Sequence, residues 1–463
     1  MNTSKNKVII TTLVILMFSQ LSFSQKQFNN WHFGSGVTFD FNSGDPVAGT
    51  NSSISVNEGS ATVSDCEGNL LFYTDGTIVW NKLNAIMPNG TGLDGGSSSV
   101  LGVPSSQGAL IVKRPETSGI FYIFTASSSK GLKYSIVNMT LNGGLGDVLV
   151  KNIVLDTNRT EKLAVTYHSN LKDIWVVTHY NKTNQYDSFL MTKDGVVPNG
   201  VSSFDGDNHE DSHGDLKVSR DGTKIGSVVD FKGRIYLGDF NTTTGVISNT
   251  ASVGGYANPH GLEFSPDNSK MYINSTTSGI IQFPIAGTNS QTLNNSTTIG
   301  SSTGVYGSLQ LAPNDKIYVT NANSNYIGVI SEPNANGNTA SFTKEAVFVG
   351  GDRAGYELTN VTLVSSCDVE VSLIEKNNSS TCDFTISPNP AINKVQYVLT
   401  IKHLGTQKIS LFDMLGNEVF QRLYKDQQGI LKDFIPCAKY NRGIYLLCVT
   451  NGQSVQTKKI ILQ

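Results

Sequence analysis

The chain has 463 residues, of which 34 are Lys or Arg and 37 are Asp or Glu, giving a formal net charge of -3 at pH 7. This balance lacks the basic footprint of a nucleic-acid-binding protein and argues against that class. Only 15% of the residues are charged, while Gly occurs 45 times, a composition typical of many short strands joined by turns.

The first 24 residues have the pattern of a cleavable signal peptide. Lys5 and Lys7 supply a positive start, and residues 8–18 form an apolar run that is too short to cross a bilayer comfortably. Small residues at Ser22 and Ser24 predict cleavage after Ser24. A retained membrane anchor is the alternative, which the length of the run disfavours. We therefore expect a mature chain outside the cytoplasm, without a transmembrane segment.

The body of the chain, residues 25–367, contains a repeat with a period of about fifty residues. Each copy has a polar residue, a short alternating apolar run, a turn of Asp, Asn, Gly or Pro, and a second β-rich run. This pattern predicts a β-hairpin with its turn chemistry at the tip. Four of the copies are Glu58–Phe72, His213–Ile225, Pro259–Tyr272 and Tyr306–Tyr318. Units of this length with four strands are typical of the blades of a β-propeller.

Both ends of the body are expected to contribute to a seventh blade. One more repeat places a strand at Tyr356–Leu363, and the body ends almost immediately afterwards. The N-terminal segment Trp31–Val56 can supply the missing strands and so remove the open sheet edges. We therefore predict an all-β protein: a seven-bladed β-propeller followed by a small immunoglobulin-like β-sandwich.

The body contains four further motifs, at Asn30–Gly34, Leu71–Asn81, Met87–Leu93 and Gly144–Asp147. Together they resemble the secreted propellers of gliding-type Bacteroidetes. The stretch Ser265–Ile273 is similar to lactonase-like and WD40-like propellers. The resemblance covers about Asn29 to Cys367 and implies a fold, but no catalytic residues can be carried over from it.

A polar linker, residues 368–381, leads to a different module at residues 382–463. Its six or seven short strands predict a small sandwich. The order of its motifs closely resembles the type A C-terminal sorting domain of the type IX secretion system. The resemblance rests on Ser387, Pro388, Asn389, Pro390, Gly443, Tyr445, Lys458 and Lys459. It implies that the module interacts with the type IX secretion machinery and directs the protein to the outer cell surface or the medium.

Five cysteines are compatible with disulfide bonds in an exported chain. Cys367 with Cys382 and Cys437 with Cys448 are the expected pairs, although spacing alone cannot establish connectivity. Cys66 is then left over and is expected to be a small buried residue.

A metal site is suggested by two patterns in one loop. The run His209-Glu-Asp-Ser-His213 matches the zinc protease motif, but that motif needs a helix, and the flanking Asp, Asn and Gly residues argue against one. Asp205, Asp207 and Asp211 could instead ligate calcium, although the loop lacks the Gly and terminal Glu of an EF-hand. A solvated polar loop is the alternative. No other cofactor is expected.

The residues that open the blades are the main candidates for a ligand site, because the first strands line a propeller's central channel. These residues are Glu58, Gln107, Glu161, His213, His260, Tyr306 and Tyr356. The alternative is that their side chains only hydrogen-bond neighbouring blades. Trp31, Trp80 and Trp175 lie in apolar alternating strands, which favours core packing over sugar stacking.

Two functions remain open. The first is an exported protein that binds another protein or a polysaccharide without catalysis. The second is an extracellular hydrolase of lactonase type, or a lyase, acting at the channel mouth. Convergence of Glu58, His213 and His260 would favour the second, because carboxylates and imidazoles perform acid–base chemistry. No nucleophile elbow or phosphate-binding loop supports a specific reaction.

Overall fold

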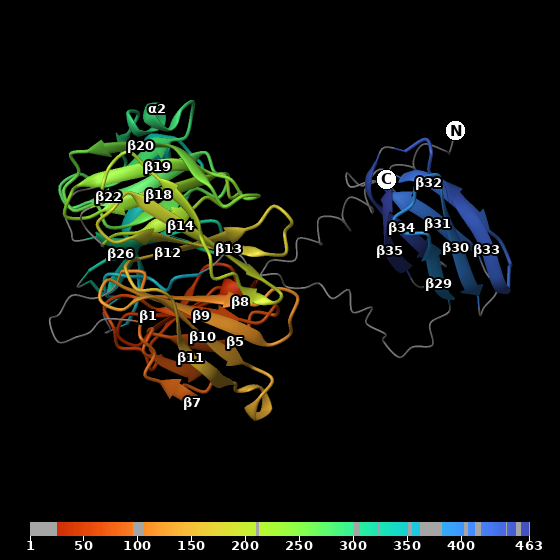
Figure 1. Cartoon of the computed structure of the whole chain (residues 1–463), viewed down its shortest axis with the longest axis horizontal. Coiled ribbons are helices and arrows are strands. Elements are labelled where there is room, and N and C mark those ends of the chain that lie inside the picture. The colour runs from red at the N-terminus through yellow and green to blue at the C-terminus, as the bar shows by residue number, and fades with distance from the viewer. Residues whose placement is uncertain are drawn as a thin grey trace. The chain divides into compact units, whose positions relative to one another are not determined.

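The computed structural model describes residues 26–95, 106–209, 213–300, 306–322, 324–350, 354–361, 382–401, 406–412, 418–440, 442–450 and 455–462. The chain divides into two compact units, Met1–Asp368 and Val369–Gln463, and each is described by itself. Strands dominate both units, which confirms the prediction of an all-β protein (Figure 1). The described helical segments are η1 (Lys26–Phe28), η2 (Asn142–Gly144), α2 (Asn289–Leu293) and η3 (Gly337–Ala340).

The described part of the first unit contains seven antiparallel sheets, each built from strands that follow one another along the chain. Their strands are β1 (Asn30–Phe33), β2 (Val37–Asp40) and β3 (Val47–Gly49); β4 (Ala61–Ser64), β5 (Leu70–Thr74), β6 (Ile78–Asn81) and β7 (Ile86–Thr91); β8 (Ala109–Lys113), β9 (Ile120–Ser127), β10 (Gly131–Asn138) and β11 (Asp147–Asp156); β12 (Arg159–Tyr167), β13 (Ile174–Tyr180), β14 (Gln185–Thr192), β15 (Gly195–Val196) and β16 (Val201–Phe204); β17 (Leu216–Val218), β18 (Lys224–Val229), β19 (Arg234–Phe240) and β20 (Ile247–Gly254); β21 (Leu262–Phe264), β22 (Lys270–Ser275), β23 (Gly279–Pro284) and β24 (Thr297–Thr298); β25 (Tyr306–Leu311), β26 (Ile317–Asn321), β27 (Tyr326–Ile330) and β28 (Phe342–Phe348).

The repeated turn residues account for the hairpins that open these sheets. In the turn between β21 and β22, Ser265 Oγ accepts the backbone N–H of Lys270 at 2.9 Å. The carboxylate of Asp267 accepts another backbone N–H of the same turn at 3.0 Å, and Asn268 adopts a left-handed conformation with a φ of 61°. Asn tolerates this conformation better than most residues. The turn at 219–224 has the same pattern of bonds, so the repeat in sequence is a repeat in structure.

Each sheet of the first unit packs against the next through a buried apolar cluster. Between the first two sheets, His32 stacks on Tyr73 with ring centroids 4.1 Å apart. The last sheet packs against the first, because Trp31 lies in one cluster with Tyr318 and Ile327, and the rings of Trp31 and Tyr318 are 5.7 Å apart. The seven sheets thus contact one another in cyclic order.

The three tryptophans belong to this core, as the sequence predicts. Trp31 is 0% exposed, Trp80 is 7% exposed and Trp175 is 4% exposed. Each large aromatic side chain contributes several kilocalories per mole through burial, on the order of 3 kcal/mol. None of the three is therefore available to stack on a sugar at the surface.

The segment 354–361 runs between the approach to β4 and strand β25. The backbone N–H of Tyr356 donates to the carbonyl of Asn57 at 2.8 Å, and the carbonyl of Tyr356 accepts the N–H of Ser308 at 2.8 Å. A Cβ at Gly307 would lie 1.7 Å from the Tyr356 carbonyl oxygen, so this close approach requires glycine. The predicted strand Tyr356–Leu363 is wrong for the residues described here, which form only a single bridge, at Asn360. Tight packing against both neighbours replaces a regular ladder.

The second unit contains two sheets around one shared apolar core. One sheet has the order β29 (Cys382–Ser387), β30 (Lys394–Ile401) and β33 (Gly429–Pro436), and the other has the order β32 (Glu418–Tyr424), β31 (Gln407–Phe412), β34 (Gly443–Thr450) and β35 (Val455–Leu462). Val395, Tyr397, Leu399 and Ile401 are all buried in this core, as their alternation along the strand predicts. These strands are blue in Figure 1.

Two expectations about the cysteines are wrong. Cys437 and Cys448 are both thiols, because Cys437 follows β33 in one sheet whereas Cys448 lies on β34 in the other sheet. Cys66 is disulfide-bonded and is therefore not left over. The predicted pair of Cys367 with Cys382 involves Cys367, which lies outside the described residues.

No helix in the described part of the chain is long and apolar enough to cross a membrane. The predicted signal peptide, residues 1–24, lies outside that part and remains a prediction.

Candidate functional site

The first strands of successive sheets lie beside one another. Strand β4 contacts β8, β12 contacts β17, β17 contacts β21, and β21 contacts β25. Residues just before these strands are therefore brought from distant parts of the sequence to one end of the first unit. Five acidic and imidazole side chains from this region form what we call the carboxylate–histidine cluster. Its members are Glu58, His213 and His260 before β4, β17 and β21, Glu161 within β12, and Glu357 in the segment 354–361.

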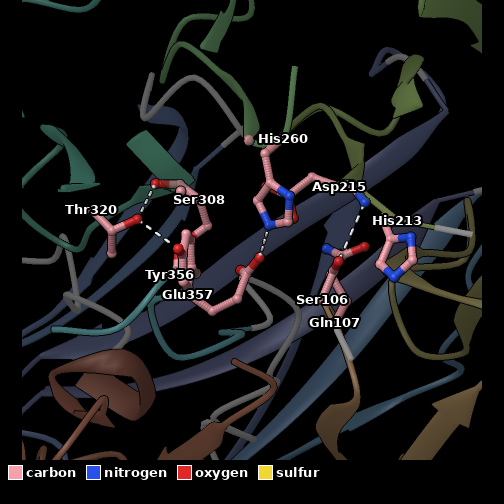
Figure 2. Close-up of polar contacts among 12 residues, drawn as sticks. Ser106, Gln107, His213, Asp215, His260, Ser308, Thr320, Tyr356 and Glu357 are labelled. Carbon is pink, nitrogen blue, oxygen red and sulfur yellow. Dashed lines mark hydrogen bonds and ion pairs between the residues drawn. The ribbon is translucent and has the colours of Figure 1, made fainter. Parts of the chain in front are cut away.

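The centre of this cluster is a contact between His260 and Glu357 (Figure 2). His260 Nε2 and Glu357 Oε1 are 2.6 Å apart, and the other ring nitrogen, Nδ1, lies 3.4 Å from Asp230 Oδ2. One atom each of Glu58, His260 and Glu357 lie within 4.8 Å of one another. Three separate segments thus meet here: the residues before β4, those before β21 and the segment 354–361.

Burial changes the protonation of the three central groups. It raises the pKa of Glu357 to about 7, assisted by the charge of Asp215, and it raises the pKa of Glu58 to about 7, assisted by the charge of Glu357. Burial lowers the pKa of His260, but hydrogen bonds to Asp230 and Glu357 and the charges of Glu357 and Glu58 outweigh it. The pKa of His260 is therefore well above its ordinary value.

The cluster is partly exposed to solvent, on the side of Glu58 and His213. His260 is 9% exposed, Glu357 is 4% exposed and Glu161 is 5% exposed, whereas Glu58 and His213 are partly exposed. A ligand approaching from solvent would therefore meet Glu58 and His213 first. The buried members can act on it only through this partly exposed pair or through a bound ion or water.

Glu161 and His213 form the flank of the cluster. The carboxylate of Glu161 accepts the N–H of Ser106 at 3.1 Å and the hydroxyl of Ser128 at 3.2 Å, while burial raises its pKa. The charge of His213 lowers the pKa of both Glu58 and Glu161, so the imidazole interacts electrostatically with both carboxyl groups. Its ring also lies edge-on to Phe231, with centroids 5.3 Å apart.

Other predicted members of the ring have structural contacts. Gln107 accepts the N–H of Leu216 at 2.9 Å and of Leu163 at 3.2 Å, and it donates to the Leu216 carbonyl at 3.1 Å. This is the bonding between neighbouring sheets that was the alternative to ligand binding. The Tyr356 carbonyl accepts the hydroxyl of Thr320 at 2.7 Å, and the side chain of Tyr306 lies outside the described part of the structure.

The acidic loop has partners within the protein. Asp205 Oδ2 lies 2.8 Å from Nε2 of His209, and Asp207 Oδ2 lies 2.5 Å from a guanidinium nitrogen of Arg234. Asp211 lies outside the described residues, so the calcium site predicted from these three carboxylates stays a prediction.

His209 and His213 have different surroundings. The ring of His209 is fully buried and stacks on His179 with centroids 4.0 Å apart, whereas His213 faces the carboxylate–histidine cluster. This arrangement agrees with the rejection of a helical zinc protease motif.

The far ends of the same first strands enclose a cavity of about 290 Å³. Lys217 lines this cavity. Its ammonium group donates to Gln310 at 2.7 Å and lies 3.7 Å from the carboxylate of Glu263. Lys217, Glu263 and Gln310 thus contact one another in the wall of this cavity.

Three residues at the site were not singled out from the sequence: Glu357, Asp215 and Asp230. The fifty-residue period located Tyr356, one position before Glu357. Asp215 lies two residues after His213, and alternate residues of an extended segment share a face, which is a signal that could have found it. Asp230 directly follows the end of strand β18, and no feature of the repeat distinguishes it.

Residues of the predicted sorting motif join the two ends of the second unit. Asn389 donates to the carbonyl of Lys459 at 2.8 Å and accepts the N–H of Ile461 at 2.9 Å, so the opening turn binds the last strand. Ser387–Pro388 and Asn389–Pro390 are cis peptide bonds. Tyr445 is buried in the core, and the ammonium group of Lys458 lies 5.3 Å from the ring of Phe384.

Comparison with solved structures yields distant resemblances. A functionally unknown protein from Desulfotomaculum acetoxidans is 12% identical with a TM-score of 0.43, over 72% of this chain and 99% of that one. A putative 6-phosphogluconolactonase from Bacteroides fragilis is 13% identical with a TM-score of 0.37, over 82% and 98%. A second putative 6-phosphogluconolactonase, from Bacteroides uniformis, is 14% identical with a TM-score of 0.36, over 82% and 100%. Scores at this level carry no argument about function.

No curated protein matches the chain significantly. Residues 385–463, by contrast, match the family described as the secretion system C-terminal sorting domain. This match covers nearly all of the second unit, including the Asn389 turn and the last strand. The protein therefore carries a C-terminal sorting domain of type IX secretion and is an exported protein.

Proposed function

We propose that this exported protein presents a seven-bladed β-propeller at the cell surface or in the medium, and that the propeller binds a polysaccharide at the carboxylate–histidine cluster. Seven sheets in cyclic contact support the propeller, and two sheets around one core support an immunoglobulin-like sorting domain. The predicted signal peptide would lead the chain to the periplasm, and the sorting domain would pass it to the type IX machinery.

The convergence of Glu58, His260 and Glu357 is the observation that carries this proposal. Residues from three distant segments would not be expected to place ionisable groups together at a partly exposed position unless the site interacts with something. Buried ionisable groups cost free energy in the folded state, so such clusters are concentrated at functional sites.

The charge of the cluster favours a neutral ligand rich in hydroxyl groups. The three carboxyl groups of the cluster, with the neighbouring Asp215 and Asp230, outnumber the imidazoles of His213 and His260. They disfavour anionic ligands, because like charges repel. Carboxylates accept hydrogen bonds from hydroxyl groups, and such bonds to a charged acceptor are roughly twice as strong as neutral ones. A neutral polysaccharide therefore fits better than an acidic one, and better than the flat surface of a protein.

Binding to an array of neutral and acidic oligosaccharides tests this proposal. The full mature chain is expected to bind neutral members, and Glu58→Gln is expected to weaken that binding. Glu67→Gln is the matched control, since Glu67 lies exposed in the turn between β4 and β5. Absence of binding to every neutral oligosaccharide, or equal binding by both variants, would contradict the proposal.

A second candidate is an enzyme of hydrolase, lactonase or lyase type. The contact between His260 and Glu357 beside the partly exposed Glu58 favours it, because positioned carboxyl and imidazole groups transfer protons to and from substrates. Incubation with the oligosaccharides that bind, followed by mass spectrometry of the products, separates the two. Intact oligosaccharides after long incubation leave binding alone.

A further inference from the structure

We propose that Glu58, His260 and Glu357 together hold one divalent transition-metal ion, for which Zn²⁺ and Mn²⁺ are the probes. The inference uses the same site as the proposed function and rests on it only for the role of the ion, not for its presence.

The three donor atoms are close enough to share one ion. They lie within 4.8 Å of one another, and two of them, on His260 and Glu357, are 2.6 Å apart. Ligand atoms about 2.1 Å from a tetrahedral ion are roughly 3.4 Å from each other. Modest side-chain rotations therefore suffice: Glu58 moves inward, and His260 and Glu357 exchange their mutual hydrogen bond for bonds to the ion.

The donor set selects the class of ion. Two carboxylates and one imidazole combine oxygen and nitrogen donors, and imidazole suits Zn²⁺ and related ions, whereas carboxylate also suits Mn²⁺. Calcium prefers six to eight oxygen donors, which this trio does not offer. The inferred ion therefore differs from the calcium predicted for the loop of Asp205 and Asp207, which lies elsewhere in the fold.

Two buried carboxylate oxygens at the cluster would be stabilised by a cation. Glu58 Oε2 and Asp215 Oδ1 are both buried and have no hydrogen-bond partner in the described structure. Asp215 is 1% exposed, and its charge acts on both Glu357 and His260. A buried carboxylate oxygen left without a partner is costly, and a bound divalent ion offsets that cost for the whole group.

Two lysines whose charges act on Asp215 donate their hydrogen bonds to other atoms. Lys162 Nζ donates to the carbonyls of His213, Gly214 and Val228. Lys217 Nζ donates to Gln310. Their charges lower the pKa of Asp215, and the charge of Lys217 also lowers the pKa of Glu357, so a bound ion would add to positive charge that already acts on these carboxyl groups.

A second layer orients the imidazole. Asp230 Oδ2 lies 3.4 Å from Nδ1 of His260, which leaves Nε2 turned toward Glu357. Metal-binding histidines commonly have this arrangement, in which a carboxylate contacts one ring nitrogen while the other binds the ion.

The open side of the cluster leaves room for a further ligand. Glu58 and His213 are partly exposed, so the positions of the ion not filled by protein face the solvent. An ion with three protein ligands keeps an open position for water or for an oxygen of a bound molecule. In the proposed function, that oxygen belongs to a hydroxyl group of the polysaccharide.

Metal titration of the untagged, full mature chain tests the inference. After treatment with a chelator, calorimetry with Zn²⁺ and then Mn²⁺ should give one site per chain, and elemental analysis after desalting should find one bound Zn²⁺. Glu357→Gln and Glu58→Gln should each weaken binding at least about tenfold, since loss of even an outer-shell partner has effects of this size. Glu67→Gln should bind as the unchanged protein does.

Two variants keep the result interpretable. Glu357 is buried, so its variant is accepted only if circular dichroism and the melting temperature match the parent; Glu58 is partly exposed, so Glu58→Gln remains informative if the other fails to fold. Absence of a Zn²⁺ or Mn²⁺ site, or equal affinity in Glu58→Gln and Glu67→Gln, would overturn the inference. Oligosaccharide binding measured with and without the ion separates the two proposals: metal binding without oligosaccharide binding overturns only the proposed function.

Discussion

Buried histidines occur in two kinds of surroundings in this body, and the difference separates a region that stabilises the fold from the region that we propose as a binding site. His179 and His209 stack on each other among tyrosines, and burial lowers the pKa of both. His260 lies among carboxylates, which raise its pKa despite burial. A neutral imidazole stacked between aromatic rings contributes to core packing, whereas an imidazole among carboxylates can exchange protons or bind ions.

Removal of the His209 ring should have the largest effect on stability. We expect His209→Ala to lower the free energy of unfolding by about 3 kcal/mol, because the ring is fully buried against His179 and Tyr236 and bonds to Asp205. Urea denaturation measures this loss. Oligosaccharide binding well below the melting temperature should be unchanged, and a loss of binding by the folded variant would break the comparison.

Gln107 should belong with the stabilising residues, although the sequence places it among the ligand candidates. Gln107→Ala removes its bonds to Leu163 and Leu216 and leaves backbone groups without partners. We expect a loss of about 2 kcal/mol in unfolding free energy and no change in oligosaccharide affinity. Denaturation and array binding of the same preparation check both parts; the opposite pattern would move Gln107 into the binding site.

Glu58→Gln should give the reverse result. Above about pH 8, where Glu58 with its pKa of about 7 is ionised, the expected loss of oligosaccharide affinity is about tenfold, equivalent to about 1.4 kcal/mol. The reason is that a hydrogen bond to a charged acceptor is replaced by one to a neutral acceptor. The unfolding free energy of the variant should not fall by more than about 0.5 kcal/mol, because a neutral amide of similar size replaces a carboxyl group with one buried, unpartnered oxygen. Titration with the strongest-binding oligosaccharide of the array, beside Glu67→Gln, provides the measurement.

The burial of His32 should make the free energy of unfolding depend on pH. Burial lowers the pKa of His32 to about 3, so the unfolded chain binds a proton on this residue below about pH 6.5 while the folded chain does not. The contribution of His32 to the free energy of unfolding is therefore complete above pH 6.5. It is lost as the pH falls toward 3, by up to about 1.4 kcal/mol per pH unit.

Comparison of His32→Gln with the parent isolates this contribution. Urea denaturation at pH 7, 6, 5 and 4 should give a shallower decline for the variant. Equal slopes in the two proteins would show that His32 does not carry the effect.

Much of the fold follows from local patterns. Ser265 and Asp267 build their turn with bonds inside six residues, so the repeat that contains them predicts a hairpin wherever it occurs. The alternation from Val395 to Ile401 predicts a strand with one buried face for the same reason. These contacts depend on neighbours in sequence, which a single chain displays directly.

The remaining features depend on contacts between distant segments. The repeat period points to Tyr356, but a one-residue difference in an extended segment reverses the direction of the side chain, and Glu357 is the residue that meets His260. Cys437 and Cys448 are near each other in sequence yet belong to opposite sheets. Asp230 acts on His260 only because two sheets bring them together.

The most direct test of the central claim measures Glu58→Gln and His209→Ala side by side, for both oligosaccharide affinity and unfolding free energy. The account predicts that Glu58→Gln loses affinity and keeps stability, and that His209→Ala loses stability and keeps affinity. If both variants lost affinity equally, or if neither did, the carboxylate–histidine cluster would not be the binding site.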